Sequence, residues 1–431
     1  MNSKIFISYR RDDSAASAGM VGCTQYFLNG RPYQANNRKR QLALDSYKHT
    51  TRQTKSPLIE VNKPLQALKL MNKMITLFAL LLSALSCGQT QEMAANTAIQ
   101  EQIDQYVERV MSRQGIPGLA LAIIQDGKTL HQKNYGYANL EHQVPMSDQS
   151  IFRVYSLTKP IVVVGVFQLI EEGKLDLEDE VSKYVADLPE AWQAIKIKHL
   201  LSHSSGLPDM APIPEFQDLT EEEAVAKVFA QACRITPGQR YDYKQSGYWM
   251  LKEVVERIVG KDLATWISER QFPSPCDTAF FSSDSRDIVL HRTTPYFPFT
   301  KGTMTIDHPY LQGTYAHAMN GLNITLNEFI KWDEALHNNS WIKPETKHQM
   351  WQEYDYSQSD KVFTYGWDKR LVGDHVSYGF SGSLITAYRV FPADKLSIVF
   401  LSNGLTSFYN IEDVMNDLAG VVFEVSQGKG E

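Results

Sequence analysis

Hydrophobic positions recur with two different periods along most of the chain, and these periods predict both helices and strands. Ile99, Ile103, Val107 and Val110 share one face of a helix. Residues 119–138 read LALAIIQDGKTLHQKNYGYA, in which two strand-like runs flank an Asp-Gly pair. An Asp-Gly pair between two such runs is a strong signal for a β-hairpin. The patterned part of the chain is therefore expected to open with a helix and two antiparallel strands.

The middle of the chain shows mainly helical spacing, and strand-like runs return near the C-terminus. Helices are expected over 156–172, 220–232, 246–269 and 410–425, a turn leading into a helix over 320–336, and strands over 384–391 and 396–403. Terminal strands and helices around a helical middle favour an α+β fold. It would have one antiparallel sheet, built from both chain ends and flanked by helices, and a helical second lobe. A ligand site is expected between the sheet and that lobe.

A targeting signal is predicted within MNKMITLFALLLSALSCGQTQE, residues 71–92. Lys73 precedes an apolar run from Met74 to Leu85, and small residues then lead to Cys87. The run is shorter than the roughly 20 residues that span a bilayer, and it has the layout of a secretory signal. Its end resembles a bacterial lipobox, in which the cysteine is lipidated and becomes the new N-terminus. The alternative is a short buried helix.

The domain boundaries follow from the position of this signal, which we assign to residues 71–87. Residues 1–70 are expected to be a disordered upstream extension, with Met71 or Met74 as the physiological start. Their opening, KIFISYRRDDSA, resembles the start of a TIR domain, but such a fold needs roughly a hundred residues or more. Residues 88–96 would be a tether, and residues 97–427 the main domain.

Composition and charge narrow the possible functions. Of the 431 residues, 43% are hydrophobic, which is enough for a large core. Residues 1–73 hold 13 basic and 4 acidic residues, whereas the remainder holds 30 and 45, a net charge of −15. An acidic main domain argues against nucleic acid as a partner. The eleven histidines include no HxH or HExxH motif and the four cysteines no CxxC pair, so we expect no metal and no cofactor. Cys233 and Cys276 could pair in an oxidising compartment.

Candidate chemistry begins at FRVYSLTKPI, where Ser156 precedes Lys159 by three residues. On a helix this spacing puts both side chains on one face, so the amine can hydrogen-bond the hydroxyl. A serine hydroxyl becomes a good nucleophile when a neighbour takes its proton, and a helix N-terminus offers N–H groups to an oxyanion. The chain has two further Ser-x-x-Lys pairs, beginning at Ser340 and Ser426. Alone, the motif favours a simpler interpretation, in which the serine opens a helix and the lysine is solvated.

Several further sequence stretches, in the order found in a known family, favour a catalytic role for Ser156 and Lys159. The chain resembles the family of serine β-lactamases and penicillin-binding proteins, in the branch of class C β-lactamases, esterases and D-amino-acid peptidases. The resemblance spans about 103–403 and rests on IPGLALAIIQDGKTLHQKNYGYANLEHQVPMS, FRVYSLTKPI, IKIKHLLSHSSGLPD, PGQRYDYKQSGYWML and NGLNIT. It implies a β-lactamase/transpeptidase-like fold and an activity that passes through an acyl-enzyme.

The resemblance also implies roles for individual residues. Ser156 would be the acylated nucleophile, and Lys159 would share or shuttle its proton. Tyr243 would be the general base and later the acid toward the leaving group. Gln245 stands where the family has an asparagine that helps to bind the substrate amide and to orient the lysine.

The third family motif departs from the pattern. The family has Lys-Thr-Gly or His-x-Gly on a strand beside the serine, whereas the best match here is Phe380-Ser381-Gly382, followed by Ser383. The small residues would still let substrate lie against the strand. The backbone N–H of Ser383 would complete an oxyanion hole with that of Ser156.

The missing cation bears on activity. A free tyrosine has a pKa of about 10, so its use as a base near neutrality costs about 4 kcal/mol. One cation at about 4 Å supplies on the order of 4 kcal/mol at an effective dielectric constant of 20. The shifted register Ser377-Tyr378-Gly379 also lacks a cation, and Lys244, directly after Tyr243, is expected to point away from the site. We therefore expect activity that is weak, alkaline-shifted or restricted to activated esters.

These observations predict a serine hydrolase of the periplasm or cell envelope, attached to the membrane only through a lipid anchor at Cys87. Its substrate would be an ester, a D-amino-acid peptide or a β-lactam, with an ester or small amide favoured. The alternative, suggested by Gln245 and Phe380, is a catalytically weak or silent relative that binds cell-wall peptide or a protein partner.

Overall fold

The structure is a computed structural model that describes part of the chain. The described residues are 63–210, 219–272, 277–282, 284, 287–297, 304–306, 313–407 and 409–426, without the side chains of 63–68, 79–95 and 425–426. The TIR-like start, most of the predicted extension and Cys276 lie outside the described residues, and so does the side chain of Cys87. Lipidation of that cysteine stays a prediction.

The first helix, α1 (Lys63–Gln114), is longer than the sequence predicts. It includes residues 63–70, where we expected disorder, and residues 88–96, which we assigned to a tether. The segment KPLQALKL is rich in strong helix formers, and its proline falls in the first turn, where a missing N–H costs no hydrogen bond. Gly115, in the left-handed conformation with φ +61, ends the helix as a C-terminal cap. None of the helices in the described part of the chain is long and apolar enough to cross a membrane.

The predicted hairpin is confirmed. Strands β1 (Gly118–Gln125) and β2 (Lys128–Asn139) pair antiparallel. Asp126 and Gly127, between them, both have positive φ values of 51 and 71, as a tight hairpin turn requires. On its other side β1 pairs with β12 (Leu396–Ser402), so the sheet joins the two ends of the domain as expected.

In the described part of the chain, seven antiparallel strands form the main sheet in the order β3-β2-β1-β12-β11-β10-β9. The remaining members are β3 (Val144–Pro145), β9 (Asp368–Val372), β10 (His375–Gly382) and β11 (Thr386–Phe391). A small sheet joins β4 (Ile151–Arg153), β8 (Leu322–Thr325) and β5 (Ala279–Phe281), and β6 (Tyr296–Phe297) pairs with β7 (Thr305–Ile306). The antiparallel sheet among helices confirms the predicted α+β class.

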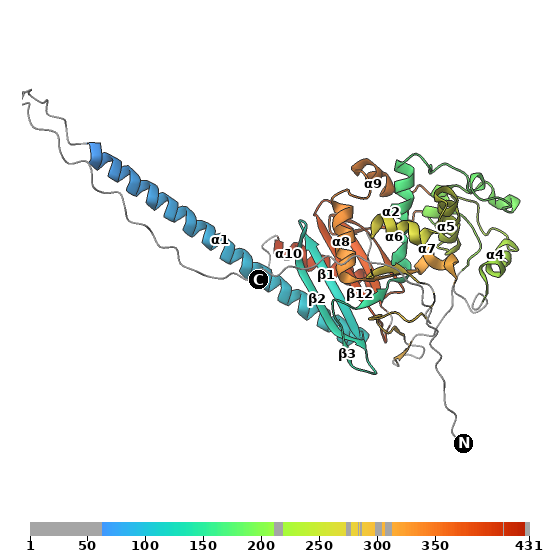
Figure 1. Ribbon diagram of the computed structural model, residues 1–431, viewed down its shortest axis with the longest axis horizontal. Coiled ribbons are helices and arrows are strands. Elements are labelled where there is room, and N and C mark those ends of the chain that lie inside the picture. The colour runs from blue at the N-terminus through green and yellow to red at the C-terminus, as the bar shows by residue number, and fades with distance from the viewer. Residues whose placement is uncertain are drawn as a thin grey trace, which may run out of the picture. The chain divides into compact units, whose positions relative to one another are not determined.

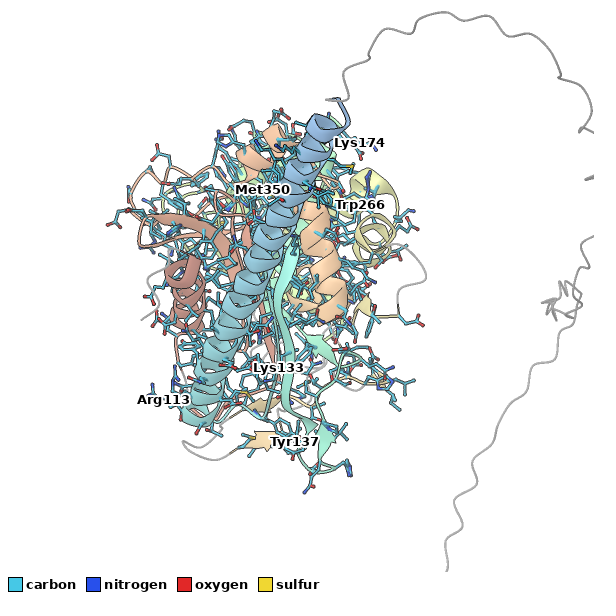
Figure 2. All side chains as sticks on the ribbon, turned by 90° about the vertical axis from the view of Figure 1, so that its left-hand side faces the viewer. Arg113, Lys133, Tyr137, Lys174, Trp266 and Met350 are labelled. Carbon is cyan, nitrogen blue, oxygen red and sulfur yellow. The ribbon has the colours of Figure 1, made fainter. Side chains whose placement is uncertain are left out.

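Helices cover both faces of the main sheet. The last turns of α1 and α10 (Ile411–Ser426) lie on one face, and α8 (Leu326–His337) lies on the other (Figure 1). Ile103 of α1 and Met415 of α10 share a buried cluster with apolar residues of β1 and β12. Figure 2 looks onto the face with α1, where Lys133 of β2 pairs with Asp104 of that helix at 2.5 Å.

A helical lobe lies on the α8 side of the sheet (Figure 1). Its helices are α2 (Thr158–Glu171), α3 (Ile197–Leu201), α4 (Glu221–Phe229), α5 (Ser246–Val259), α6 (Leu263–Gln271), α7 (His317–Asn320) and α9 (Pro344–Met350). Buried residues continue around α2 from Thr158 to Leu169, which explains why its sequence is apolar on all sides. The Ser156 motif lies at the start of this helix, so the segment that carries it is anchored in the core.

One predicted helix is in fact two. Residues 246–269 were expected to form one helix, but α5 ends at Gly260, which has a positive φ of 70. Asp262 then opens α6, where its side chain accepts a hydrogen bond from the N–H of Thr265 at 2.8 Å. A left-handed glycine followed by an acidic N-cap is a strong stop and start signal that the apolar spacing alone conceals.

Candidate active site

Ser156 lies in a tight turn at the entrance to α2. The turn is a 3-10 helix (Tyr155–Leu157), and the N–H of Leu157 donates to the carbonyl of Val154 at 3.1 Å. Tyr155 has a positive φ of 49, which is rare for an aromatic residue and stores strain next to the serine. The serine is half-buried, at the point where the small sheet passes into the core helix.

Lys159 is fully buried, one turn further along. Its Nζ donates to Ser156 Oγ at 3.1 Å, to Gln245 Oε1 at 2.9 Å and to the carbonyl of Met319 at 2.8 Å. An ammonium group has three donors, so each one has an acceptor. Burial lowers the pKa of the Lys159 amine, while Tyr243 and Asp209 oppose that shift. The group is therefore held in place and biased toward losing a proton.

Tyr243 reaches the same serine from the loop before α5. Its hydroxyl lies 2.8 Å from Ser156 Oγ, and Lys159 Nζ lies 5.1 Å from the centre of its ring. The structure thus brings together the three residues predicted to carry the chemistry, with Ser156 Oγ hydrogen-bonded to both of the others. A proton can pass from the serine to the tyrosine without movement of the backbone.

Gln245 joins this group at the start of α5. Its side-chain oxygen accepts from Lys159, and its backbone N–H donates to Asp209 Oδ1 at 2.9 Å. Asp209 was not predicted as a site residue. It ends the loop LLSHSSGLPD, and the negative charge next to a proline was its only sequence signal. It fixes the helix end that carries Gln245 and contributes negative charge near Lys159.

The carbonyl of Met319 is the other contact that the sequence analysis missed. It lies in α7 and accepts from Lys159 at 2.8 Å. Any residue type supplies a backbone carbonyl, so no side-chain pattern could mark it. The N–H of Leu322 donates to the hydroxyl of Thr158 at 3.1 Å, which ties the neighbouring segment to the start of α2.

The end of β10 lies against the turn that holds Ser156. A Cβ on Gly382 would come within 2.1 Å of the carbonyl oxygen of Val154, so only glycine allows this approach. Thr386, opposite Gly382 on β11, donates its hydroxyl to the same carbonyl at 2.9 Å. The predicted third motif is therefore beside the serine, with Ser381 half-buried on the strand and Ser383 exposed in the turn that follows.

Phe380 is buried rather than open to the cleft. Its ring lies against Tyr243, with centroids 6.3 Å apart, and against Phe363, at 6.2 Å. The shifted register is excluded as a functional match, because Ser377 is buried and accepts a hydrogen bond from Arg389 at 3.1 Å. An aromatic ring thus stands at the position where the predicted resemblance implies a cation, and this ring lies against that of Tyr243.

Residues 103–421 match the profile of the beta-lactamase family. The chain belongs to the beta-lactamase family. The match confirms the predicted resemblance to this family, and it covers the segments that carry Ser156, Lys159 and Tyr243.

Individual relatives are distant. Protein flp of Staphylococcus aureus is 27% identical over 184 residues, which are 39% of this chain and 35% of that protein. The chain thus matches about a third of the length of this curated relative. Penicillin-binding protein 4 of Bacillus subtilis is 23% identical over 309 residues, which are 65% of this chain and 66% of that protein.

The solved structures show the fold. The D-amino acid amidase of Ochrobactrum anthropi SV3, complexed with L-phenylalanine amide, has a TM-score of 0.65 and 20% identity. The match covers 77% of this chain and 99% of the amidase. This likeness confirms the β-lactamase/transpeptidase-like architecture of the beta-lactamase-family member.

Three remaining predictions concern groups outside this cluster. Lys244 forms an ion pair with Asp242 at 2.8 Å. In the described part of the chain, no group of His, Cys, Asp and Glu side chains is arranged to hold a metal ion. Cys233 is half-buried, with its Sγ 3.9 Å from the carbonyl of Ala191. Its pairing with Cys276 stays a prediction, since that residue is outside the described part.

Proposed function

We propose that the protein is a serine hydrolase that forms an acyl-enzyme at Ser156. The observation that supports this proposal is the pair of hydrogen bonds at Ser156 Oγ, to Tyr243 at 2.8 Å and to Lys159 at 3.1 Å. A serine that only opened a helix would not need a buried amine and a phenol at its hydroxyl. The arrangement is that of a nucleophile with its base.

The proposed reaction has two halves. Tyr243, assisted by Lys159, takes the proton of Ser156 as Oγ attacks the substrate carbonyl. The bond to the leaving group then breaks, and Tyr243 returns the proton to that group. In the second half a water molecule loses its proton to the same pair as its oxygen attacks the acyl carbonyl. The bond between the acyl group and Ser156 Oγ then breaks, the acid leaves, and the proton returns to Oγ. The backbone N–H groups of Ser156 and Ser383 would stabilise the oxyanion in both halves.

The substrate class follows from Phe380. A cation at this position would suit a carboxylate next to the scissile bond, whereas the buried ring of Phe380 offers such a carboxylate no positive charge. A small amide or ester therefore suits the site better than a β-lactam, whose carboxylate would lack a partner there. The amidase with the similar fold is named for amides of this kind.

The missing cation also bears on pH dependence. We expect weak or alkaline-shifted hydrolysis, although burial partly offsets this by lowering the pKa of the Lys159 amine. The pH profile of p-nitrophenyl acetate hydrolysis measures the shift. Rapid hydrolysis of a β-lactam at neutral pH would contradict both the substrate class and the weak base.

Covalent labelling tests the proposal directly. A fluorophosphonate probe should label the wild-type protein, and the label should map to Ser156 by mass spectrometry. Ser156→Ala should abolish it, while Ser340→Ala, in another Ser-x-x-Lys pair at an exposed position, should leave it unchanged. Labelling that survives in Ser156→Ala would reject the proposed nucleophile.

A second candidate function is a silent relative that binds cell-wall peptide or a protein partner. Phe380 favours this alternative, because it occupies the place of a cation that would assist the base. A wild-type protein that folds and binds D-amino-acid peptides, but resists the probe across the pH range, would support it.

We further propose that the enzyme works in the periplasm or cell envelope, attached to the membrane only by a lipid on Cys87. The segment before this cysteine carries exposed apolar side chains at Leu70, Met71, Met74, Ile75, Leu77 and Phe78. These side chains are free to enter a membrane or the secretion machinery. Mass spectrometry of the N-terminus in wild-type and Cys87→Ser proteins tests the proposal. An unprocessed N-terminus in the wild type would reject it.

A further inference from the structure

His203 lies against the tyrosine of the active site. It belongs to the stretch LLSHSSGLPD, and its side chain is almost fully buried. Its ring centroid lies 4.5 Å from that of Tyr243, 5.3 Å from Tyr248 and 5.6 Å from Phe363. The imidazole thus forms part of the wall that supports the tyrosine hydrogen-bonded to Ser156.

The backbone of His203 also holds the segment that carries Tyr243. Its carbonyl accepts from the N–H of Asp242 at 2.7 Å, one residue before Tyr243. This geometry depends on the positive φ of 52 at His203, a conformation that histidine tolerates better than most larger residues. The carbonyl of Ser204 accepts from the N–H of Gly238 at 2.8 Å, further back along the same loop. The main chain of this loop and the imidazole ring of His203 therefore both position Tyr243.

Burial favours the uncharged form of the imidazole. It lowers the pKa of His203 well below its usual value, and the nearby charge of Lys159 adds to the effect. The titratable groups that face the ring are Lys159, Lys244, Tyr241, Tyr243 and Tyr248. The backbone of Lys244 opposes the shift through a hydrogen-bonding interaction with the ring, but its geometry falls short of a full hydrogen bond. The ring is therefore held mainly by the aromatic side chains around it.

We propose that His203 is a positioning residue, whose imidazole ring and left-handed backbone hold Tyr243 at hydrogen-bonding distance from Ser156 and keep water from Lys159. The inference rests on the proposed function, because it assigns a task to a wall of the proposed active site. The ring acts through the tyrosine and the lysine and does not touch substrate.

The test uses one variant that removes the ring and one that keeps it. Asparagine tolerates a positive φ, so His203→Asn should fold while it leaves Tyr243 unsupported and admits water. A small displacement of a catalytic group costs up to about a hundredfold, so we expect kcat for p-nitrophenyl acetate to fall about tenfold to a hundredfold with little change in KM. The acidic limb of the kcat profile should move to higher pH, because hydration raises the pKa of the Lys159 amine toward its usual value. His203→Phe keeps a ring and should retain more activity than His203→Asn.

His199 provides the matched control. It is a buried histidine four residues earlier that contacts Tyr354, with ring centroids 6.4 Å apart, and makes no ring contact with Tyr243 in the described structure. His199→Asn should lower the melting temperature without moving the pH profile. An unchanged kcat and pH profile in folded His203→Asn would overturn the inference, and so would the same shift in His199→Asn. If His203→Asn does not fold, His203→Phe decides: a limb moved to higher pH despite an intact ring would overturn the inference, and an unmoved limb would support it.

The two proposals fail in different ways. If the fluorophosphonate does not label Ser156 in the wild-type protein, the proposed function itself is wrong. If it labels Ser156 in the wild type and reacts equally fast with His203→Asn at every pH, only the role of His203 is wrong. Slower labelling of His203→Asn, with an acidic limb at higher pH, supports both.

Discussion

The ring of Phe380 lies against the ring of Tyr243, with centroids 6.3 Å apart and planes 30° from parallel. A lysine or histidine would stand at the Phe380 position in the family pattern, where its charge would stabilise a phenolate. Here Tyr243 has an apolar neighbour at this position instead. The cation beside the tyrosine is Lys159, which donates a hydrogen bond to Ser156 Oγ and lies 5.1 Å from the centre of the Tyr243 ring. The same fold thus holds the acid–base groups with a different electrostatic setting.

Restoring a cation at this position should make the enzyme more active near neutrality. Phe380→Lys places an amine next to Tyr243, and its positive charge should assist proton removal from Ser156. We expect kcat/KM for p-nitrophenyl acetate at neutral pH to rise about tenfold, which corresponds to an interaction of about 1.4 kcal/mol. Stopped-flow kinetics across the pH range measures the change. Val376→Lys, on the same strand, is the control, and an equal rise there would contradict the explanation.

The charge of Asp209 should set the pH range of activity. Its carboxylate raises the pKa of the Lys159 amine, so Asp209→Asn should lower that pKa and move the acidic limb of kcat/KM to lower pH. Asparagine keeps the oxygen that accepts from the N–H of Gln245, so the fold should be retained. Asp242→Asn, which removes the ion-pair partner of Lys244, should leave the limb in place. A limb that moves to higher pH in Asp209→Asn would contradict the role of the carboxylate.

The contact between Gly382 and the serine turn should tolerate no side chain. Gly382→Ala places a Cβ 2.1 Å from the carbonyl oxygen of Val154, and either the strand or the turn must move. We expect the free energy of unfolding to fall by about 2–3 kcal/mol, as for an overpacked core, and labelling of Ser156 to slow by at least about tenfold.

Gly420 in α10 is the matched glycine. A Cβ there meets no atom within 4 Å, so Gly420→Ala should raise the free energy of unfolding by about 0.5–1 kcal/mol and leave labelling unchanged. Urea denaturation and probe kinetics compare the two variants. Equal stability in Gly382→Ala and wild type would show that β10 does not press against the turn.

Acidification should destabilise the protein through His317. Burial lowers the pKa of His317 from 6.5 to about 4. Between these two pH values the unfolded chain therefore binds a proton at His317 that the folded protein does not bind. The free energy of unfolding is therefore unaffected by His317 above about pH 6.5, and it falls as the pH drops toward 4. The loss should amount to about 1–3 kcal/mol after allowance for partial exposure. His317→Gln should flatten the dependence of the unfolding free energy on pH in this window, whereas the exposed His348→Gln should not. An unchanged slope in His317→Gln would reject this assignment.

Sequence reasoning recovered the parts of the fold that depend on local signals. The Asp126-Gly127 turn predicted the hairpin, because its two residues need positive φ values that few other pairs adopt. The spacing of Ser156 and Lys159 predicted their contact, since both lie on one helical turn. The break at Gly260 was missed, because apolar residues continue on both sides of it.

The remaining site residues come from distant parts of the chain. Asp209 acts through the N-terminus of α5, and Met319 contributes only a backbone carbonyl. The packing of His203 and Phe380 on Tyr243 depends on how two loops meet strand β10, which no local spacing encodes. The family motifs marked the positions of Tyr243 and Phe380 but not the contact between them.

The pairing of β1 with β12 has a consequence for the order in which the molecule is made. Leu119 lies opposite Ser402, so the centre of the sheet closes only after the chain has been made as far as Ser402 and has left the ribosome. Until then β10 and Gly382 have no completed sheet to hold them beside Ser156. The surroundings of Ser156 therefore form only after these strands have been made, and a chain released before that point would contain Ser156 without them.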